Sequence, residues 1–505
     1  MIPAITGAAL IGGRCCVICG SSRYATLAAS ALAENMSRAI LIPLIVACAL
    51  FMENMDSTVL ATALPAIAAD MGENPLSLKL AITSYLISLA IFIPISGWVA
   101  DRYGSRTVFI AAMLVFMVGS LSCANADTLT GFVIARFFQG MGGAMMVPVG
   151  RLIIMRSVPK AGVVKAMSYL TMPAMLGPIM GPPLGGLITE HFSWRGIFLI
   201  NVPVSILGLI LIFFFIPNLR EENVPAMDGR GLFLSGLGLS MILLALSALG
   251  GHLLPDAVIA MCFLVGCLSL YAYWRHSLVA PHPVLRLDLL QLTSFRAGVV
   301  GGTLFRIGTG ALPFLLPLML QLGFGLSPSQ SGLITCFTAV GALSMRTFTV
   351  FILRRIGFRR ALTWNSVGSS LVLVGFGLFT AETSHTFIAA VLMITGCFRA
   401  LQFTYTNTVA YADVNRETMG YATSFASMAH RISQSIGVAV GAYALELSST
   451  LQGHTSIVTE DFLPAFAVAT LISLSSVYFY RQLPPDAGAE MSGHRAKPME
   501  KKINE

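Results

Sequence analysis

Ionisable side chains inside otherwise apolar stretches are the residues of this sequence that could do chemistry. Glu53 and Asp56 lie three residues apart in a long apolar run, so both carboxylates would share one face of a helix. Arg136 lies in another apolar run. An ionised group in hydrocarbon costs several kcal/mol unless it faces water or an opposite charge. We therefore expect the two carboxylates to face an aqueous cavity as the leading candidates for a proton or cation site, and Arg136 to have a partner of opposite charge or polarity.

Simpler roles for these residues stay open. Either carboxylate would merely be solvated if it lay near a helix end, and Arg136 could pair with Asp56 or Gln139 for structure alone. Further polar residues lie in the apolar runs of the later sequence. Arginines there would attract anionic substrates or pair with carboxylates, or else extend to the membrane surface, and a lone histidine is more often structural than a proton relay. The candidate substrate-cavity residues are Gln139, Arg306, Arg399, His430 and Arg431.

A short loop between Gly97 and Arg106 joins two apolar runs and contains a carboxylate flanked by guanidiniums. Glycines suit places where backbones come close, and such a charge cluster could form a latch between two parts of the molecule. The alternative is a tight basic loop that only sets the topology. The candidate latch residues are Gly97, Asp101, Arg102, Gly104 and Arg106.

The apolar run from 163 to 189 contains many residues that would be unfavourable in a soluble helix. In lipid, glycine permits close packing of helices and proline permits kinks, so this segment suits a helix that reorients. Tight packing without motion is the alternative. The residues concerned are Gly177, Pro178, Gly181, Pro182, Gly185 and Gly186.

The elements that position these residues must lie in a membrane. Of the 505 residues, 56% are hydrophobic and 11% are charged, whereas a soluble domain has about 25% charged residues. The net charge of +8 is carried largely by short loops, where it orients helices and gives no indication of nucleic-acid binding. The cysteines and histidines lack metal-ligand spacing, and the sequence contains no P-loop or catalytic triad. We expect no cofactor, no metal and no enzymatic activity.

Charged or Pro/Gly-rich breaks divide the chain into fourteen apolar segments. We expect an all-α integral membrane protein with a poorly ordered leader (1–35), two pseudo-symmetric six-helix bundles (36–217 and 291–482), two linking transmembrane helices (218–290) and a disordered cytoplasmic tail (483–505). The leader could result from a misplaced start, because Met36 would itself make a normal start. The segments lie near 39–64, 78–100, 107–125, 128–150, 163–189, 196–217, 231–250, 255–274, 296–322, 329–352, 361–380, 385–411, 420–446 and 461–480.

Two patterns in the loops support this organisation. Basic residues concentrate in alternate loops, which places both termini in the cytoplasm. The loop sequence at 101–106 is similar to residues 354–359, each after the second segment of its bundle, as expected for two related halves.

Five segments in order resemble the major facilitator superfamily, and in particular its fourteen-span drug:proton antiporter branch of the EmrB/QacA type. They are residues 55–65, 97–106, 135–143, 177–186 and 194–203. The likeness extends from about Met36 to Arg481. Two departures stand out: Ala61 occupies a position where the branch usually has Asn, and Gly196 one where it often has an aromatic residue.

The resemblance implies a proton-linked carrier with a central cavity. It assigns Asp56 and Arg136 to proton coupling, Asp101 and Arg102 to the gating latch, and the 163–189 helix to the antiporter signature. We therefore expect a monomeric, proton-coupled antiporter that exports small amphipathic molecules, aromatic or cationic, across the inner membrane by alternating access. A proton-linked metabolite carrier (symporter or uniporter) and a non-transporting membrane sensor with a carrier fold are the alternatives.

Overall fold

The computed structural model describes residues 17–158, 163–221, 224, 226–249, 255–281, 283–415, 418–454 and 457–489. Within these ranges the chain is helical and has no strand. Of the expected leader and tail, residues 1–16 and 490–505 lie outside the described residues, whereas residues 17–35 belong to the first helix.

The main helices follow the expected apolar segments. The first half contains α1 (Val17–Met71), α2 (Lys79–Tyr103), α3 (Ser105–Ala124), α4 (Leu129–Ser157), α5 (Val163–His191), α6 (Gly196–Leu199) and α7 (Asn201–Phe215). The linking pair is α8 (Gly229–Ala248) and α9 (Asp256–Ser277). The second half contains α10 (Thr293–Arg296), α11 (Gly302–Gly310), α12 (Leu312–Leu318), α13 (Pro328–Thr335), α14 (Phe337–Gly375), α15 (His385–Ala410), α16 (Met419–Gln452) and α17 (Phe462–Arg481).

Local sequence signals set where several helices begin and end. The Thr128 hydroxyl accepts a hydrogen bond from the backbone of Gly131 and caps α4, and the Asp228 carboxylate caps α8 in the same way. Ser327 and Gln330 form a reciprocal capping box at α13. Gly104, with φ of 95°, separates α2 from α3, a backbone conformation that side chains with a Cβ rarely adopt.

Eleven stretches of the described residues are long and apolar enough to cross a bilayer. The helices α5 and α16 are not among them. One of the eleven, Pro328–Leu378, is 51 residues long, and α14 is kinked within it at Gly357, where φ is 71°. The kink falls where the sequence predicts a break, between residues 352 and 361.

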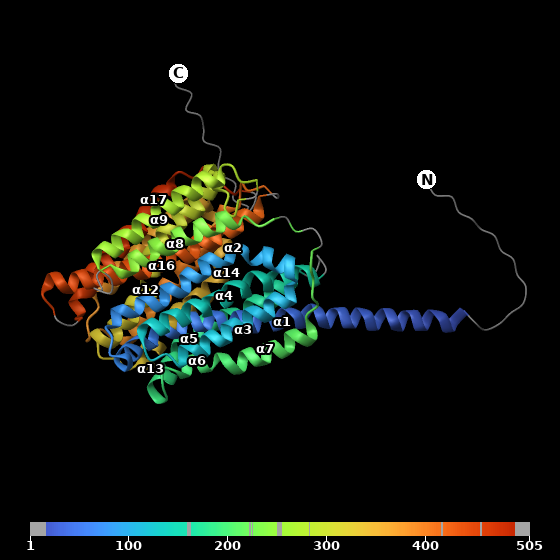
Figure 1. The fold of residues 1–505 in the computed structure, drawn as a ribbon, viewed down its shortest axis with the longest axis horizontal. Coiled ribbons are helices and arrows are strands. Elements are labelled where there is room, and N and C mark those ends of the chain that lie inside the picture. Colours follow the sequence, from blue (N-terminus) through green and yellow to red (C-terminus); the bar gives the residue numbers. More distant parts are fainter. Residues whose placement is uncertain are drawn as a thin grey trace, which may run out of the picture.

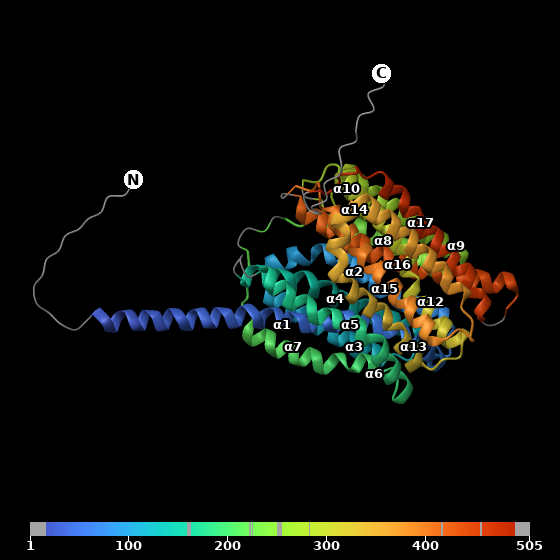
Figure 2. The same cartoon turned by 180° about the vertical axis from the view of Figure 1, so that it is seen from behind.

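The helices of the first half (α1 to α7) pack beside those of the second half (α10 to α17), and α8 and α9 lie next to them (Figure 1). In the first half, α1 packs against α5, and α4 packs against α2 and α3. In the second half, α14 packs against α15 and α17, and α11 packs against α16 and α17. Helix α8 contacts α2 and α16, one helix from each half, and α9 packs against α8. Both views show the N-terminal part of α1 projecting beyond the bundles (Figures 1 and 2).

Polar contacts join the two halves at the end where α1 and α5 finish. The Gln321 side chain donates to the carbonyl of Thr62 at 2.9 Å, and the Ser329 backbone donates to the Glu190 carboxylate at 3.0 Å. The apolar core there also draws on both halves, because residues of α1 and α4 share one cluster with residues of α12, α16 and α17. This end of the cavity between the halves is therefore closed by the protein.

Candidate functional site

Asp56 and Arg136, both predicted from the sequence, form a buried ion pair between α1 and α4. The Arg136 Nη1 and Asp56 Oδ2 atoms lie 2.7 Å apart, and each residue is 1% exposed. Gln139 and Asn201 donate to the other carboxylate oxygen at 2.9 and 3.0 Å. Three donors from two helices therefore surround one carboxylate, which satisfies the requirement that a buried charge be paired and hydrogen-bonded.

Neighbouring residues hold this cluster in place. The Ser120 hydroxyl accepts hydrogen bonds from Gln139 at 2.7 Å and from Asn201 at 3.2 Å. The Arg136 guanidinium lies over the Tyr85 ring, 4.3 Å from its centroid, in a cation–π arrangement. A Cβ at Gly119 would lie 2.7 Å from the backbone nitrogen of Gln139, so glycine is needed for α3 to approach α4 this closely.

Gln139 was expected on the wall of a substrate cavity, and the structure places it in the Asp56 cluster instead. It is fully buried and also donates one hydrogen bond to Ser120 while accepting one from Arg136. The reason is its position three residues after Arg136 on the same helix face. Sequence reasoning missed Tyr85, Ser120 and Asn201 as partners, although Asn201 lies inside one of the segments that carried the family resemblance.

Glu53, the second predicted carboxylate, pairs with a residue of the other half. Its Oε1 lies 3.1 Å from Arg431 Nη2 on α16, and Glu53 is 1% exposed. The two residues are 378 positions apart in the sequence. This ion pair therefore bridges the two halves across the interior of the molecule.

A cavity of about 500 Å³ lies between the halves and collects most of the predicted cavity residues. Arg306, Arg399, His430 and Arg431 line it, together with Arg136 from the first half. Residues of α1, α2, α5, α11, α12, α14, α15 and α16 all contribute to its wall. Ala61, at one of the two departures from the family pattern, also lines this cavity.

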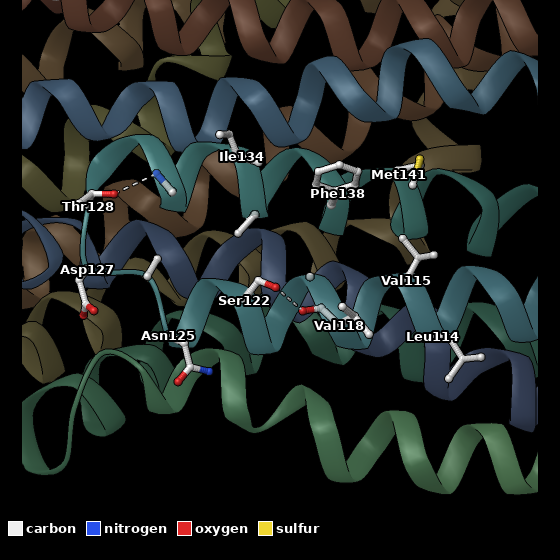
Figure 3. Close-up of a pocket in the computed structure, with 14 residues that line it drawn as sticks. Leu114, Val115, Val118, Ser122, Asn125, Asp127, Thr128, Ile134, Phe138 and Met141 are labelled. Atoms are coloured by element: carbon white, nitrogen blue, oxygen red, sulfur yellow. Dashed lines mark hydrogen bonds between the residues drawn. The ribbon is translucent and has the colours of Figure 1, made fainter.

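A second hollow, of about 840 Å³, runs between α3 and α4 and is a different kind of surface (Figure 3). Leu114, Val118, Ile134 and Phe138, which line it, are exposed apolar side chains. Exposed apolar side chains on helices that can cross a bilayer face lipid. We therefore place the functional site in the cavity between the halves.

The loop at Gly97–Arg106 does not join the halves in this structure. Asp101 pairs with Arg156 at 2.9 Å, and Arg156 also pairs with Glu221 at 2.9 Å, so the described partners of Asp101 belong to the first half or directly follow it. Arg106 lies over the Phe213 ring, 5.9 Å from its centroid, and Arg102 is exposed. The expected latch between halves is therefore an ion-pair cluster at one end of α2 and α4.

The glycines of this loop differ in what they do. A side chain at Gly104 would meet Asn218 at 2.8 Å, and its backbone already requires glycine. Around Gly97 there is open space, because a Cβ there would meet nothing within 4 Å. The group close to Gly104 is the Asn218 side chain, and nothing lies close to Gly97, so a close approach of another backbone does not explain the glycine at either position.

The glycines of α5 bring this helix against both halves. A Cβ at Gly177 would lie 2.9 Å from the Met55 nitrogen, and one at Gly185 would lie 2.7 Å from the Val59 carbonyl oxygen. Gly181 lies on the same face of α5 and is next to Thr58 of α1, whereas Gly186 is next to the start of α13 in the second half. Pro178 and Pro182 line the cavity. The predicted close packing is thus present, with α1 as the partner of three glycines that follow one another at intervals of four residues, over about two turns of the helix.

Comparison with known proteins identifies the family. The sequence profile of the Major Facilitator Superfamily matches residues 46–312 and 298–501. The chain belongs to the major facilitator superfamily. Among its relatives, a Yersinia enterocolitica protein named for multidrug resistance (MdtD) is 36% identical over 459 residues, which cover 90% of this chain and 97% of that protein. The Pectobacterium atrosepticum protein of the same name is 36% identical over 445 residues, covering 88% and 95%.

Solved structures of transporters share the fold. A D-xylose-proton symporter has a TM-score of 0.63 at 15% identity and covers 89% of this chain and 98% of its own. A POT family peptide transporter has a TM-score of 0.66 at 16% identity and covers 88% and 97%. This superfamily member is therefore a multi-pass membrane transporter and not an enzyme, as the sequence predicts.

Proposed function

We propose that this chain is a proton-coupled antiporter that exports small amphipathic or drug-like molecules across the inner membrane. The observation that carries the proposal is the buried Asp56–Arg136 pair, held by α1 and α4 beside a cavity that Arg136 itself lines. A carboxylate deep in a membrane protein is a proton site by default. Relatives named for multidrug resistance support the class of substrate.

Proton binding at Asp56 would be linked to rearrangement of the cluster. A proton on this carboxylate removes the negative charge that faces Arg136, which is 1% exposed. Leaving a buried guanidinium without its partner is costly. A proton on Asp56 would therefore favour a rearranged cluster around Arg136, which lines the cavity. Antiport requires that this rearranged state bind the substrate less tightly, so that proton and substrate occupy the protein in turn.

The Glu53–Arg431 pair would transmit such a change between the halves. It joins α1 to α16, so protonation of Glu53 would loosen a contact that holds the halves together at the centre of the molecule. The contacts between Gln321 and Thr62 and between Ser329 and Glu190 close one end in this conformation. Alternating access would require these contacts to break while others form at the opposite end.

A count of fourteen spans fits the helices. To the eleven long apolar stretches we add α5 and α16, which are long enough to cross a bilayer, and we divide Pro328–Leu378 at Gly357. The spans then form two six-helix bundles, 36–217 and 291–482, linked by the pair at 218–290, with both termini cytoplasmic and the monomer as the functional unit. The loop of Asp101 lies on the cytoplasmic side in this arrangement.

Transport into inverted membrane vesicles tests the proposal. A pH gradient, acidic inside the vesicles, should drive accumulation of at least one of two fluorescent amphipathic probes, one anionic and one cationic, and a protonophore should abolish it. Asp56→Asn should abolish gradient-driven accumulation, whereas the matched control Asp70→Asn should not. Asp70 lies on the same helix in an exposed ion pair with Arg195. Wild-type accumulation by Asp56→Asn would overturn the assignment of the proton site.

A further inference from the structure

The charged residues on the wall of the central cavity all carry the same sign. Among the described residues that line it, every ionisable residue that is charged at neutral pH is an arginine, and no aspartate or glutamate contributes. These arginines are Arg136, Arg306, Arg346, Arg399 and Arg431.

Only two of these arginines are neutralised by the protein. Asp56 pairs with Arg136, and Glu53 pairs with Arg431. For the other three, no ion pair with a carboxylate is formed within the described part of the chain. Arg306 donates from its Nε atom to the Ser433 hydroxyl at 3.2 Å, which leaves the two terminal nitrogens of its guanidinium free to bind another group.

Arg399 and His430 add a second unsatisfied polar surface. Among the described residues, Arg399 on α15 has no side chain or backbone group as a hydrogen-bond partner. The Nδ1 atom of His430 is buried and also without a partner. Buried polar groups are normally hydrogen-bonded, so the His430 Nδ1 atom and the partly exposed Arg399 guanidinium are both available to a polar group that enters the cavity. An unpaired guanidinium seeks a carboxylate, phosphate or sulfonate, which it can bind through two parallel hydrogen bonds.

The rest of the wall is suited to an apolar body. Phe305, Phe314 and Phe403 line the cavity, and the His430 ring packs edge-on against Phe403 with 5.6 Å between centroids. The volume of about 500 Å³ is in the range of small-molecule sites. A ligand with one anionic group and an aromatic or aliphatic body would satisfy both surfaces.

We propose that the molecule this transporter carries is an amphipathic organic anion, whose anionic group is bound by Arg306 and Arg399 and whose apolar part packs on the phenylalanines. The proposal rests on the proposed function and names its substrate class. A cation would meet three arginines without counter-charges and would be repelled. Export of an anion would also follow an inside-negative membrane potential, which favours it by about 50-fold per charge at 100 mV.

Binding to the purified full-length protein tests the charge preference without requiring transport. Three naphthalene probes share one apolar body: 2-naphthoate, neutral 2-naphthamide and cationic (2-naphthylmethyl)trimethylammonium. We expect saturable thermal stabilisation by 2-naphthoate only. This comparison uses the wild-type chain, so it does not depend on whether any variant folds. Equal or stronger binding of the cation or the amide would overturn the proposal, as would binding of none of the three.

Two variants assign the anionic group to its residues. Arg306→Gln and Arg399→Gln should each weaken 2-naphthoate binding by about tenfold to hundredfold, the range for a lost hydrogen bond to a charged group. Arg360→Gln, on an exposed arginine of α14, is the matched control and should bind as the wild type does. Undiminished binding by both cavity variants would overturn the assignment.

Transport of two xanthene dyes separates this inference from the proposed function. In inverted vesicles, anionic carboxyfluorescein should accumulate under a pH gradient and cationic rhodamine 123 should not. Accumulation of rhodamine 123 alone would overturn the anion inference and leave proton-coupled export intact. Binding of 2-naphthoate without gradient-driven transport of either dye would support the anion site and overturn the proposed function.

Discussion

Removing the charge of Asp56 should destabilise the protein chiefly by leaving Arg136 unpaired. Asp56→Asn keeps the size of the side chain and an oxygen that can accept hydrogen bonds, so packing changes little. The Arg136 guanidinium, however, loses its counter-charge while it remains 1% exposed. Breaking a buried pair from one side costs about 3–5 kcal/mol, because the remaining charge is uncompensated.

The reciprocal variant should cost less. In Arg136→Gln the Asp56 carboxylate keeps two donors, Gln139 at 2.9 Å and Asn201 at 3.0 Å. Each hydrogen bond to a charged group contributes about 1.5–3 kcal/mol, so we expect a loss of about 2 kcal/mol. The double variant has no uncompensated charge at this site. Its loss should be smaller than the sum of the single losses by about 2–3 kcal/mol, which is the upper part of the range of coupling energies in shared networks.

The free energy of unfolding of the four proteins, measured by titrating SDS into dodecyl maltoside micelles, tests this reasoning. Leu114→Ala, an exposed apolar residue of α3, serves as a control that should change stability little. Wild-type stability of Asp56→Asn would refute the claim that Arg136 depends on its partner. Additive losses in the double variant would refute the claim that the two residues act as a pair. Transport should stay absent in the double variant, because stability returns without a proton site.

Three further predictions follow from particular contacts. Gly185→Val should lower both the yield of folded protein and its transport activity, because even a Cβ there would lie 2.7 Å from the Val59 carbonyl oxygen. The control Gly97→Ala should leave both unchanged, because a Cβ there meets nothing within 4 Å. Size-exclusion chromatography measures the yield and dye uptake measures the transport. Glu446→Gln should destabilise more than Lys79→Met, because only the first leaves the fully buried Lys79 ammonium without its acidic neighbour; equal melting temperatures would contradict this. Arg195→Ala should reduce the free energy of unfolding by no more than about 1 kcal/mol, since its ion pairs are exposed, and a larger loss would contradict that ranking.

The sequence predicts the helices well because hydropathy alone determines which segments can cross a bilayer. The expected break between 352 and 361 appears as the kink at Gly357, where four arginines and a glycine interrupt the apolar pattern. The sequence also predicts the pairing of Asp56 with Arg136, because both are charged residues in apolar helices and few residues of opposite charge lie deep in a membrane protein. A search for unlike charges in apolar runs therefore finds the most buried pair.

The partners of other residues depend on how the halves pack, which no local pattern encodes. Arg431 could equally have extended to the membrane surface; its pairing with Glu53 is set by the approach of α16 to α1. Asp101 was expected to reach across the halves, and its partner is Arg156 on α4 of the same half. The sequence is the same in every conformation, so it cannot tell in which conformation a latch between the halves would form.

The arginines of the cavity differ in whether a carboxylate of the protein balances their charge, and this difference decides the role that each can play. Arg136 and Arg431 have carboxylate partners within the chain, so their charge balance changes when a proton arrives. Arg306 and Arg399 have none among the described residues, so their balance changes when an anion arrives. For the proposed exchange of a proton against an anion, the two must bind in turn, so binding of one must weaken binding of the other. The sequence shows arginines in apolar surroundings; only the structure separates those that pair with a carboxylate from those that do not.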